Sequence, residues 1–552
     1  MAGFIIANMA PIMFVSLMLF LILGFPVAFA LAANGVLFGL IGIELGLFNI
    51  SLFQALPLRV FGVMANDTLL AIPFFTFMGL VLERSGMAED LLDTIGQLFG
   101  PMPGGLAVAV VLVGSVLAAT TGVVSASVIS MGLISLPIML RYGYDRRLST
   151  GLIAATGTLS QIIPPSLVLI VLADQLGRSV GDMYKGAIVP AGLLILAYLI
   201  YVGIITLLKP VKVPAIPKED LVFRQADGSS GNMSLAVLMA VSIVLSWFAF
   251  RFGVDSAGMA MDEKAVIAVL IWGAIIFTAA VVNKVLKLGM LSIIAERVTF
   301  VLIPPLILIF LVLGTIFLGI ATPTEGGAMG AVGAVVMALV RRRLTMDLLK
   351  QAMETTTRLA CFVMFILIGS TIFTLTFRGV SGDLWVASLL TELPGGELGF
   401  LILVSVLVFV LAFFLDFFEL AFIVVPLLGP VAESLGIDLI WFGVLLAVNM
   451  QTSFVHPPFG FALFYLRSVA PKEDYVDSHT GKTIPAVKTG DIYLGSIPFI
   501  CIQLLMVAVV LAFPGLVTHY KGVATEIDYS TVDMNFDSGY GSDDAYGSGS
   551  PY

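Results

Sequence analysis

The same polar, proline-containing stretch interrupts an apolar helix in each half of the chain. Residues 156–166 read TGTLSQIIPPS, and residues 449–459 read NMQTSFVHPPF. The two Pro-Pro pairs lie 293 residues apart, and the same interval separates Asp145 from Asp438. In a bilayer, a helix is broken only where the freed backbone groups face protein or a water-filled cavity. Two matching breaks therefore predict a repeated fold with a binding site between the repeats, which is typical of membrane transporters.

An apolar composition accompanies these breaks. Of the 552 residues, 59% are hydrophobic and 11% are charged, and many apolar runs are long enough for a helix to cross a bilayer. We therefore expect an all-α polytopic membrane protein with about 12 transmembrane helices. The two cysteines, Cys361 and Cys501, lie in apolar runs, which excludes a disulfide framework.

Matching segments divide the chain into four parts. Residues 1–209 form the first predicted repeat, and residues 296–515 form the second. Residues 210–295, between them, are expected to be a cytoplasmic linker with an extra pair of helices. Residues 516–552 are acidic and rich in glycine and serine, a composition that predicts a disordered tail.

Each predicted repeat contains a re-entrant hairpin followed by a discontinuous helix. The hairpins are predicted at about 103–140 and 397–434, and the broken helices at about 148–174 and 439–466. A basic loop follows the first hairpin and an acidic loop follows the second, so the two hairpins should enter the membrane from opposite sides. The two repeats are therefore predicted to be inverted.

The basic residues also predict the orientation of the chain. If the N-terminus is outside, most of the 27 lysines and arginines fall in segments predicted to be cytoplasmic. This is the distribution that the positive-inside rule describes. Both termini are therefore expected to lie outside.

Four motifs occur in the same order as in a known family. They are the segment 66–79, the run 157–166, the run 321–325 and the segment 449–460. Through these motifs the chain resembles the large membrane (M) subunit of the tripartite ATP-independent periplasmic (TRAP) transporters, the DctM-like family of the ion-transporter superfamily. The likeness covers nearly the whole chain outside the linker and the tail.

The resemblance implies an elevator-type transporter rather than an enzyme. Such a carrier lies in a bacterial inner membrane, with both termini periplasmic, and imports an organic acid by sodium symport. A soluble periplasmic binding protein delivers the carboxylate, and a separate small four-helix membrane subunit (Q-type) is required. Sodium ions are then the coupling ions, and neither an organic cofactor nor nucleic acid is expected. The extra helix pair, residues 451–453 and residues 465–467 resemble a subclass for 2-oxo or 2-hydroxy acids.

Oxygen-bearing side chains gather at the hairpin tips and the breaks, where interrupted helices also leave carbonyl groups free. A hard cation such as sodium prefers these ligands. One sodium site is predicted between the first tip and the first break, and another between the second tip and the second break. The predicted ligands are Thr121, Gly122, Ser125, Thr156 and Thr158 in the first site, and Asp416, Asn449, Thr452 and Ser453 in the second.

The predicted substrate site lacks a cation of its own. Neither break and neither tip contains a lysine or arginine. The substrate carboxylate should therefore be held by hydroxyl groups, helix N-termini and the sodium ions. Pro164 and Pro457 are expected to open the helices after the breaks. The predicted substrate contacts are Ser160, Pro164, Ser166, Gln451, Ser453 and Pro457.

Several alternatives remain open. Asp416 could sit in a solvated turn at a shallow tip, and Glu419 could be a further ligand. The hydroxyl groups could simply bond the carbonyls of their own helices. The same architecture could act as a stand-alone sodium/dicarboxylate carrier without helper proteins. A more distant alternative is an intramembrane hydrolase that uses Ser453 and His456.

Overall fold

The computed structural model describes residues 2–223, 225, 231–253, 261–391, 394–477 and 480–521. Nearly all of this part of the chain is helical, and its strands are limited to the short antiparallel pair β1 (Tyr475–Val476) and β2 (Thr483–Ile484). The described residues contain 9 helices that are long and apolar enough to cross a membrane, or up to 12 if each bent pair is one span. The predicted all-α polytopic fold is confirmed. In the predicted tail, residues 522–552 lie outside the described residues.

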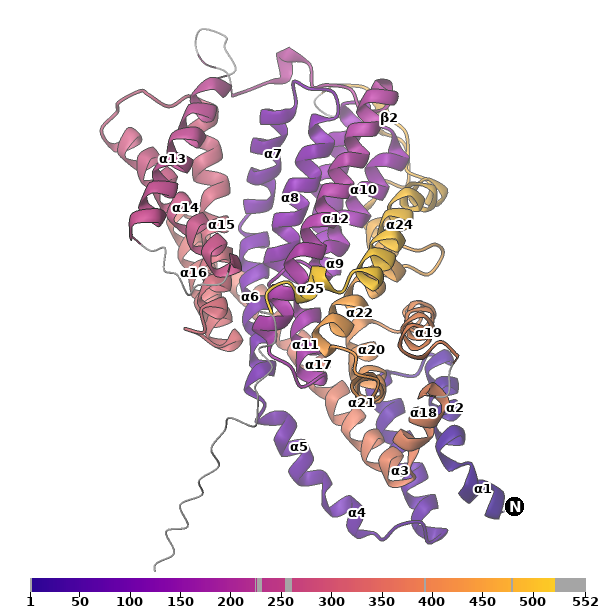
Figure 1. The fold of residues 1–552 in the computed structure, drawn as a ribbon. Helices are drawn as coiled ribbons and strands as arrows, with labels where there is room; N and C mark the ends of the chain where they lie inside the picture. The colour runs from indigo at the N-terminus through magenta and orange to yellow at the C-terminus, as the bar shows by residue number, and fades with distance from the viewer. Residues whose placement is uncertain are drawn as a thin grey trace, which may run out of the picture. The chain divides into compact units, whose positions relative to one another are not determined.

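The first predicted repeat contains twelve α-helices, drawn in the indigo to purple part of the colour scale in Figure 1, and two short 3-10 helices, written η1 and η2. They are α1 (Ala2–Ala7), α2 (Met9–Ile22), α3 (Val27–Glu44), α4 (Ser51–Gln54), α5 (Leu56–Met64), η1 (Asp67–Leu70), α6 (Ala71–Arg84), α7 (Met87–Phe99), α8 (Gly105–Thr121), α9 (Val124–Arg141), α10 (Arg146–Thr158), η2 (Leu159–Gln161), α11 (Leu167–Gln175) and α12 (Val180–Leu208).

The linker and the second predicted repeat follow. The linker contains η3 (Pro210–Lys212), η4 (Lys218–Asp220), α13 (Asn232–Gly253) and α14 (Met261–Val285). The remaining helices are α15 (Ile293–Phe317), α16 (Pro323–Val340), α17 (Met346–Gly379), α18 (Gly382–Thr391), α19 (Gly396–Leu411), α20 (Phe417–Ile423), α21 (Val425–Ser434), α22 (Leu439–Phe454), α23 (Phe461–Val469), α24 (Thr489–Ala512) and α25 (Gly515–Thr518).

Equivalent residues begin the broken helices of the two repeats. The Asp145 carboxylate accepts the backbone N–H groups two and three residues later, at 3.0 and 3.1 Å, and so caps α10. The Asp438 carboxylate caps α22 in the same way, at 2.9 and 3.0 Å. Gly143 and Gly436 precede these caps with left-handed φ angles of +81° and +78°, which glycine adopts without steric cost. The sequence repeat is therefore also a repeat of local structure.

Each repeat contains the predicted hairpin and discontinuous helix. In the first repeat, α8 and α9 pack against each other beyond the tip at residues 122–123. In the second, α19 and the bent pair α20–α21 flank the tip at residues 412–416. The first broken helix is α10–η2 and α11, separated by residues 162–166, and the second is α22 and α23, separated by residues 455–460.

Helices of one repeat pack closely against helices of the other. Helix α3 lies on α17, and α6 lies on α16. A Cβ atom at Gly35 of α3 would lie 2.8 Å from a backbone oxygen of α17, so only glycine permits this approach. Helix α10 meets α24 at Gly151 and Gly495, where added Cβ atoms would lie 1.9 and 2.0 Å from backbone oxygens of the opposite helix. Small residues allow this close packing where the lipid supplies no hydrophobic driving force.

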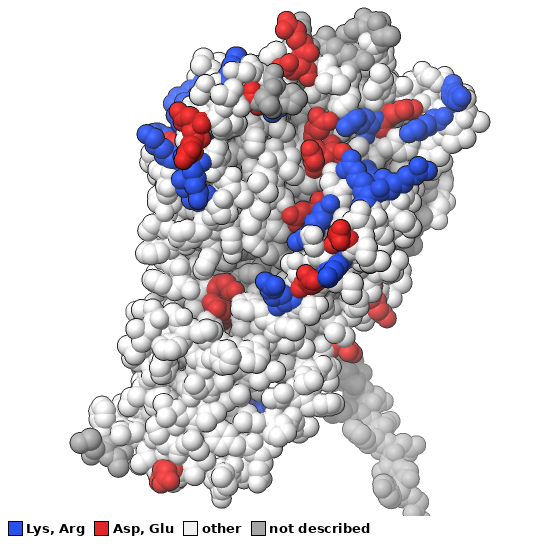
Figure 2. Space-filling model, turned by 180° about the vertical axis from the view of Figure 1, so that it is seen from behind, with Lys and Arg blue, Asp and Glu red and all other residues white. Residues whose placement is uncertain are grey.

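The surface agrees with a membrane location. Figure 2 shows charged side chains gathered mostly over the upper part of the molecule, while most of the lower part of this face is uncharged. Large apolar side chains are widely exposed, including Phe61, Trp247 and Leu339 at 65%, 59% and 60%. Such a surface is stable in contact with lipid and would promote aggregation in water.

Candidate functional site

The first hairpin tip lies against the first break. Gly122 ends α8 with a left-handed φ of +61°, and a Cβ atom placed on it would lie 3.2 Å from the Leu167 side chain and 3.5 Å from the Pro165 oxygen. The Thr121 and Ser127 hydroxyl groups are 2.6 Å apart, which joins the two arms below the tip. The structure therefore brings Thr121 and Gly122 to the break that follows Thr156 and Thr158.

The second break is held by the second hairpin in a similar way. The Asn449 amide donates to the backbone carbonyl oxygen of Ser405 at 2.7 Å, and the Ser453 hydroxyl donates to the backbone carbonyl oxygen of Phe409 at 3.1 Å. Both acceptors lie on α19. At the tip itself, the Phe413 ring lies 5.3 Å from the His456 ring. Asn449 and Ser453 of the predicted second set therefore contact the first arm of the second hairpin.

Asp416 is the N-cap of α20. Its Oδ1 atom accepts the Glu419 backbone N–H at 2.8 Å, and the Glu419 carboxylate accepts the Asp416 backbone N–H at 2.8 Å. This reciprocal capping box uses only part of the acceptor capacity of the Asp416 carboxylate. Val123, at the equivalent position of the first tip, caps α9 without a side-chain bond. Of the two tips, only the second presents a carboxylate.

The two breaks meet through residues that are equivalent in the two repeats. The Gln451 amide nitrogen lies 3.4 Å from the Thr158 hydroxyl oxygen, and these residues are 293 positions apart. The Gln503 amide of α24 reaches the same hydroxyl at 3.4 Å and the Tyr198 hydroxyl of α12 at 2.7 Å. Equivalent positions of the two breaks therefore contact each other directly.

Several amide atoms around this contact are buried without a partner among the described residues. They are both side-chain polar atoms of Gln161 and the oxygens of Gln451 and Gln503, on side chains that are 0% exposed. A buried polar group without a hydrogen bond typically costs 1–3 kcal/mol, so these atoms indicate a place for a polar guest. Gln161, Gln503 and Tyr198 were not among the predicted site residues. A polar group within an otherwise apolar crossing helix is the sequence signal for Gln503 and Tyr198.

The site hydroxyl groups also bond carbonyls of their own segments, as one alternative anticipated. These bonds are between 2.7 and 3.2 Å long. A hydroxyl group that donates one hydrogen bond keeps its oxygen lone pairs, so it can still be a cation ligand. The residues whose hydroxyl groups bond carbonyls of their own segments are Thr156, Thr158, Ser160, Ser166 and Thr452. Ser125, another predicted ligand, is half-buried in the first turn of α9.

The expectation that Pro164 and Pro457 open the next helices is wrong. Helix α11 begins at Leu167 and α23 begins at Phe461. Each Pro-Pro pair lies inside its break, because the chain runs on through non-helical residues before the next helix begins. The prolines therefore lengthen the breaks, since their nitrogens cannot donate to a helical ladder.

The geometry does not assemble a serine hydrolase. The Ser453 hydroxyl donates to the Phe409 and Asn449 oxygens at 3.1 and 3.5 Å. The His456 ring instead packs against the Phe409 and Phe413 rings, and its Nδ1 atom is buried without a partner among the described residues. A nucleophile needs a base within hydrogen-bond reach, and this pair lacks that contact.

Two repeats, each with a hairpin that meets a broken helix, form an arrangement that is typical of membrane transporters. A family model described as "Tripartite ATP-independent periplasmic transporter, DctM component" matches residues 14–516. The chain therefore belongs to the DctM component family of the TRAP transporters.

Two relatives and one solved structure are similar to this chain. The C4-dicarboxylate TRAP transporter large permease protein DctM of Pseudomonas aeruginosa is 28% identical over 77% of this chain and 82% of that protein. The 2,3-diketo-L-gulonate TRAP transporter large permease protein YiaN of Escherichia coli is 22% identical over 81% of this chain and 87% of its own. The YdaH transporter of Alcanivorax borkumensis matches with a TM-score of 0.50 and 14% identity, over 84% of this chain and 88% of that chain. This last likeness concerns the fold.

Proposed function

We propose that this chain is the carrier subunit of a sodium-coupled importer of an organic acid. The observation that carries the proposal is the contact between Thr158 and Gln451, which joins the two broken helices beside unpaired, buried amide atoms. A polar guest bound there would meet equivalent groups from both repeats. The relatives named for C4-dicarboxylates and for 2,3-diketo-L-gulonate support a carboxylate, and the second of these names supports a 2-oxo acid.

Sodium is proposed to bind on both sides of this contact. The first group combines hydroxyl oxygens with free carbonyls at the Gly122 tip, and the second adds the Asp416 carboxylate. Neutral oxygens with at most one carboxylate suit a monovalent hard cation. The proposed ligands are Thr121, Gly122, Ser125, Thr156 and Thr158 in the first group, and Asp416, Asn449, Thr452 and Ser453 in the second.

The substrate carboxylate is proposed to bind between the breaks. Gln451, Ser160, Ser166 and Ser453 provide amide and hydroxyl donors, and the breaks around Pro164 and Pro457 bring the N-termini of α11 and α23 to the site. A helix N-terminus supplies about half a positive charge. Because neither break and neither tip contains an arginine or lysine, bound sodium must supply most of the compensating charge, which couples the binding of the two solutes.

We further propose an elevator movement. The hairpins and broken helices would move together against α3, α6, α16 and α17, whose mutual packing forms a stiff frame. A site with so little positive charge should bind free substrate weakly, so it should take its substrate from a soluble periplasmic binding protein. The exposed apolar faces of the frame would contact a small four-helix membrane subunit and lipid.

Uptake in proteoliposomes tests the proposal. The purified chain, with an inward sodium gradient, is compared with the chain plus its small subunit and a loaded binding protein. Sodium-dependent uptake of a labelled 2-oxo or dicarboxylic acid is expected only in the complete system. Robust uptake by the chain alone would favour the stand-alone carrier, and uptake that is independent of sodium would contradict the coupling.

A further inference from the structure

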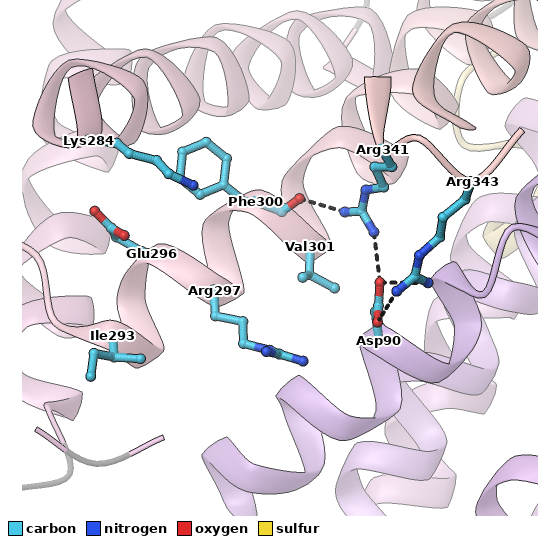
Figure 3. A pocket seen from close by; sticks show the side chains of 9 residues that line it. All are labelled: Asp90, Lys284, Ile293, Glu296, Arg297, Phe300, Val301, Arg341 and Arg343. Atoms are coloured by element: carbon cyan, nitrogen blue, oxygen red, sulfur yellow. Dashed lines mark hydrogen bonds and ion pairs between the residues drawn. The ribbon is translucent and has the colours of Figure 1, made fainter. Parts of the chain in front are cut away.

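A cavity far from the breaks brings four basic side chains together. It has a volume of about 500 Å³ and lies where α14 ends, α15 begins and α16 ends, next to the first turns of α7 (Figure 3). These helix ends carry the basic residues that predict the cytoplasmic side. Its basic lining residues are Lys284, Arg297, Arg341 and Arg343, and its acidic ones are Asp90 and Glu296.

The guanidinium groups are positioned by the surrounding helices. Arg341 and Arg343 both reach the Asp90 carboxylate, at 3.2 and 3.1 Å, and Arg341 also donates to the Phe300 oxygen at 2.6 Å. Arg297 pairs with Asp93 at 3.1 Å. One carboxylate is thus shared by two guanidinium groups, which leaves an excess of positive charge on this side of the cavity.

Lys284 adds a charge without a carboxylate partner. Its ammonium group lies 4.7 Å from the centre of the Phe300 ring, and no ion pair involves it within the described part of the chain. The nearby Glu296 carboxylate accepts a bond from the Asn283 amide at 2.9 Å. Lys284, Arg297, Arg341 and Arg343 together outnumber the acidic groups around them, so the cavity favours an anion.

The apolar lining indicates the kind of anion. Ile293, Phe300 and Val301 lie on α15 among the basic groups, so the cavity offers an apolar wall beside its cationic one (Figure 3). Basic pockets between transmembrane helices at the cytoplasmic side suit the phosphate of an anionic lipid, whose acyl chains continue along apolar helix surfaces. A volume of this size accommodates a phosphate together with its glycerol.

We propose that this cavity binds a glycerol-linked phosphate, as presented by an anionic phospholipid of the cytoplasmic leaflet. One wall belongs to α14 and α15 and the other to α7 and α16. The bound phosphate therefore bridges the extra helix pair to the frame, and anionic lipid stabilises this junction.

Lys284 is the residue to change, because it is exposed and its loss leaves no buried carboxylate unpaired. Lys284→Gln is compared with Lys287→Gln, which removes the same charge three residues later, outside the cavity. Lipid retention by native mass spectrometry and thermal unfolding in detergent are measured with phosphatidylglycerol, phosphatidylcholine or soluble glycerol phosphate. Phosphatidylglycerol should bind and stabilise more than phosphatidylcholine, and Lys284→Gln should weaken its apparent affinity about fivefold, with Lys287→Gln unaffected.

The outcomes separate the possible sources of the phosphate. Equal, Lys284-dependent stabilisation by soluble glycerol phosphate would keep the anion site and assign it to a soluble ligand. Equal binding of both lipids, or equal effects of the two substitutions, would overturn the proposal. These results do not depend on sodium-driven uptake, so they are independent of the proposed transport function.

Discussion

At the scale of single residues, the two hairpin tips differ in charge, because only the second carries a carboxylate. Asp416 and Val123 occupy equivalent positions at the starts of α20 and α9, and only Asp416 forms a capping box. Capping and ion binding are compatible for a carboxylate, because a second oxygen remains after the first accepts an N–H bond. The structural role therefore has to be kept constant when the proposed ion-binding role is tested.

Asp416→Asn separates the capping role from the proposed ion-binding role, since asparagine caps helices about as well as aspartate. Loss of a charged ligand from a site of low dielectric constant should raise the sodium concentration for half-maximal uptake by at least about tenfold, or about 1.4 kcal/mol. Asp438→Asn is the matched control, because it changes a capping aspartate away from the tips. Unchanged sodium dependence in Asp416→Asn, at normal expression, would rule out the second site as proposed.

Asp477 gives a pH-dependent prediction outside the membrane-spanning segments. Burial alone would raise the pKa of its carboxyl group, but hydrogen bonds from Thr480 and Arg141 lower the pKa to about 2. A folded-state pKa below the unfolded one contributes stability at neutral pH, and this contribution is lost as the pH falls from about 4 through about 2.

The expected result is a lower melting temperature for Asp477→Asn than for the unsubstituted chain at pH 7. The difference should shrink as the pH falls below about 4. Thermal unfolding in detergent at several pH values measures this. A melting-temperature difference that grows toward acid pH would contradict the lowered pKa of Asp477.

At the scale of secondary-structure elements, glycine controls how closely helices approach. Gly151 and Gly495 allow the backbones of α10 and α24 to touch, and α24 also carries Gln503 to the Thr158 hydroxyl. The position of the central polar contact therefore depends on a helix pair that admits no side chain at its crossing.

Gly151→Ala should destabilise the protein, because the new Cβ atom would lie 1.9 Å from the Gly495 oxygen and must push the helices apart. Overpacking of this kind costs about 1–3 kcal/mol. Gly203→Ala in α12 is the control, since nothing lies within 4 Å of its added Cβ atom and alanine favours a helix by about 1 kcal/mol. Equal melting temperatures for the two variants would show that the close approach is unimportant.

At the scale of the whole molecule, one hydrogen bond joins the frame to the first hairpin. The Ser130 hydroxyl of α9 donates to the Glu83 carboxylate of α6, whose other oxygen is buried without a partner among the described residues. If the hairpins move against the frame, this bond must break during the cycle.

A cross-link at this position tests the movement. Glu83→Cys with Ser130→Cys, made after replacement of Cys361 and Cys501 by serine, should abolish uptake under oxidising conditions and recover it after reduction. The control pair, Ser242→Cys with Trp272→Cys, joins α13 to α14, where the native side chains are 2.9 Å apart. Full uptake by the oxidised Glu83–Ser130 pair would contradict an elevator movement at this boundary.

The inverted arrangement of the repeats makes a separate prediction. Arg147 follows the first hairpin, Glu433 lies at the end of the second, and their side chains are 57% and 64% exposed. An impermeant thiol reagent should label Arg147→Cys and Glu433→Cys from opposite sides of the membrane, and Lys350→Cys from the same side as Arg147→Cys. Labelling of Arg147→Cys and Glu433→Cys from one side would disprove the predicted topology.

The sequence alone determined the elements of this protein. Helix length and break position follow from local chemistry, because apolar runs must satisfy their backbone groups internally and proline removes a donor. The spacing of 293 residues revealed the repeat, and the capping residues Asp145 and Asp438 marked where the broken helices begin. The predicted starts of the two broken helices therefore agree with the structure.

Tertiary structure decided which side chains meet. Gln503 and Tyr198 join the central contact from helices outside the breaks, so the sequence marks them as polar residues in apolar helices but does not reveal their partners. The starts of α11 and α23, at Leu167 and Phe461, also differ from the expectation at Pro164 and Pro457. The sequence specifies where a helix must break, whereas the partners of the broken ends are decided by helices that approach from elsewhere in the chain.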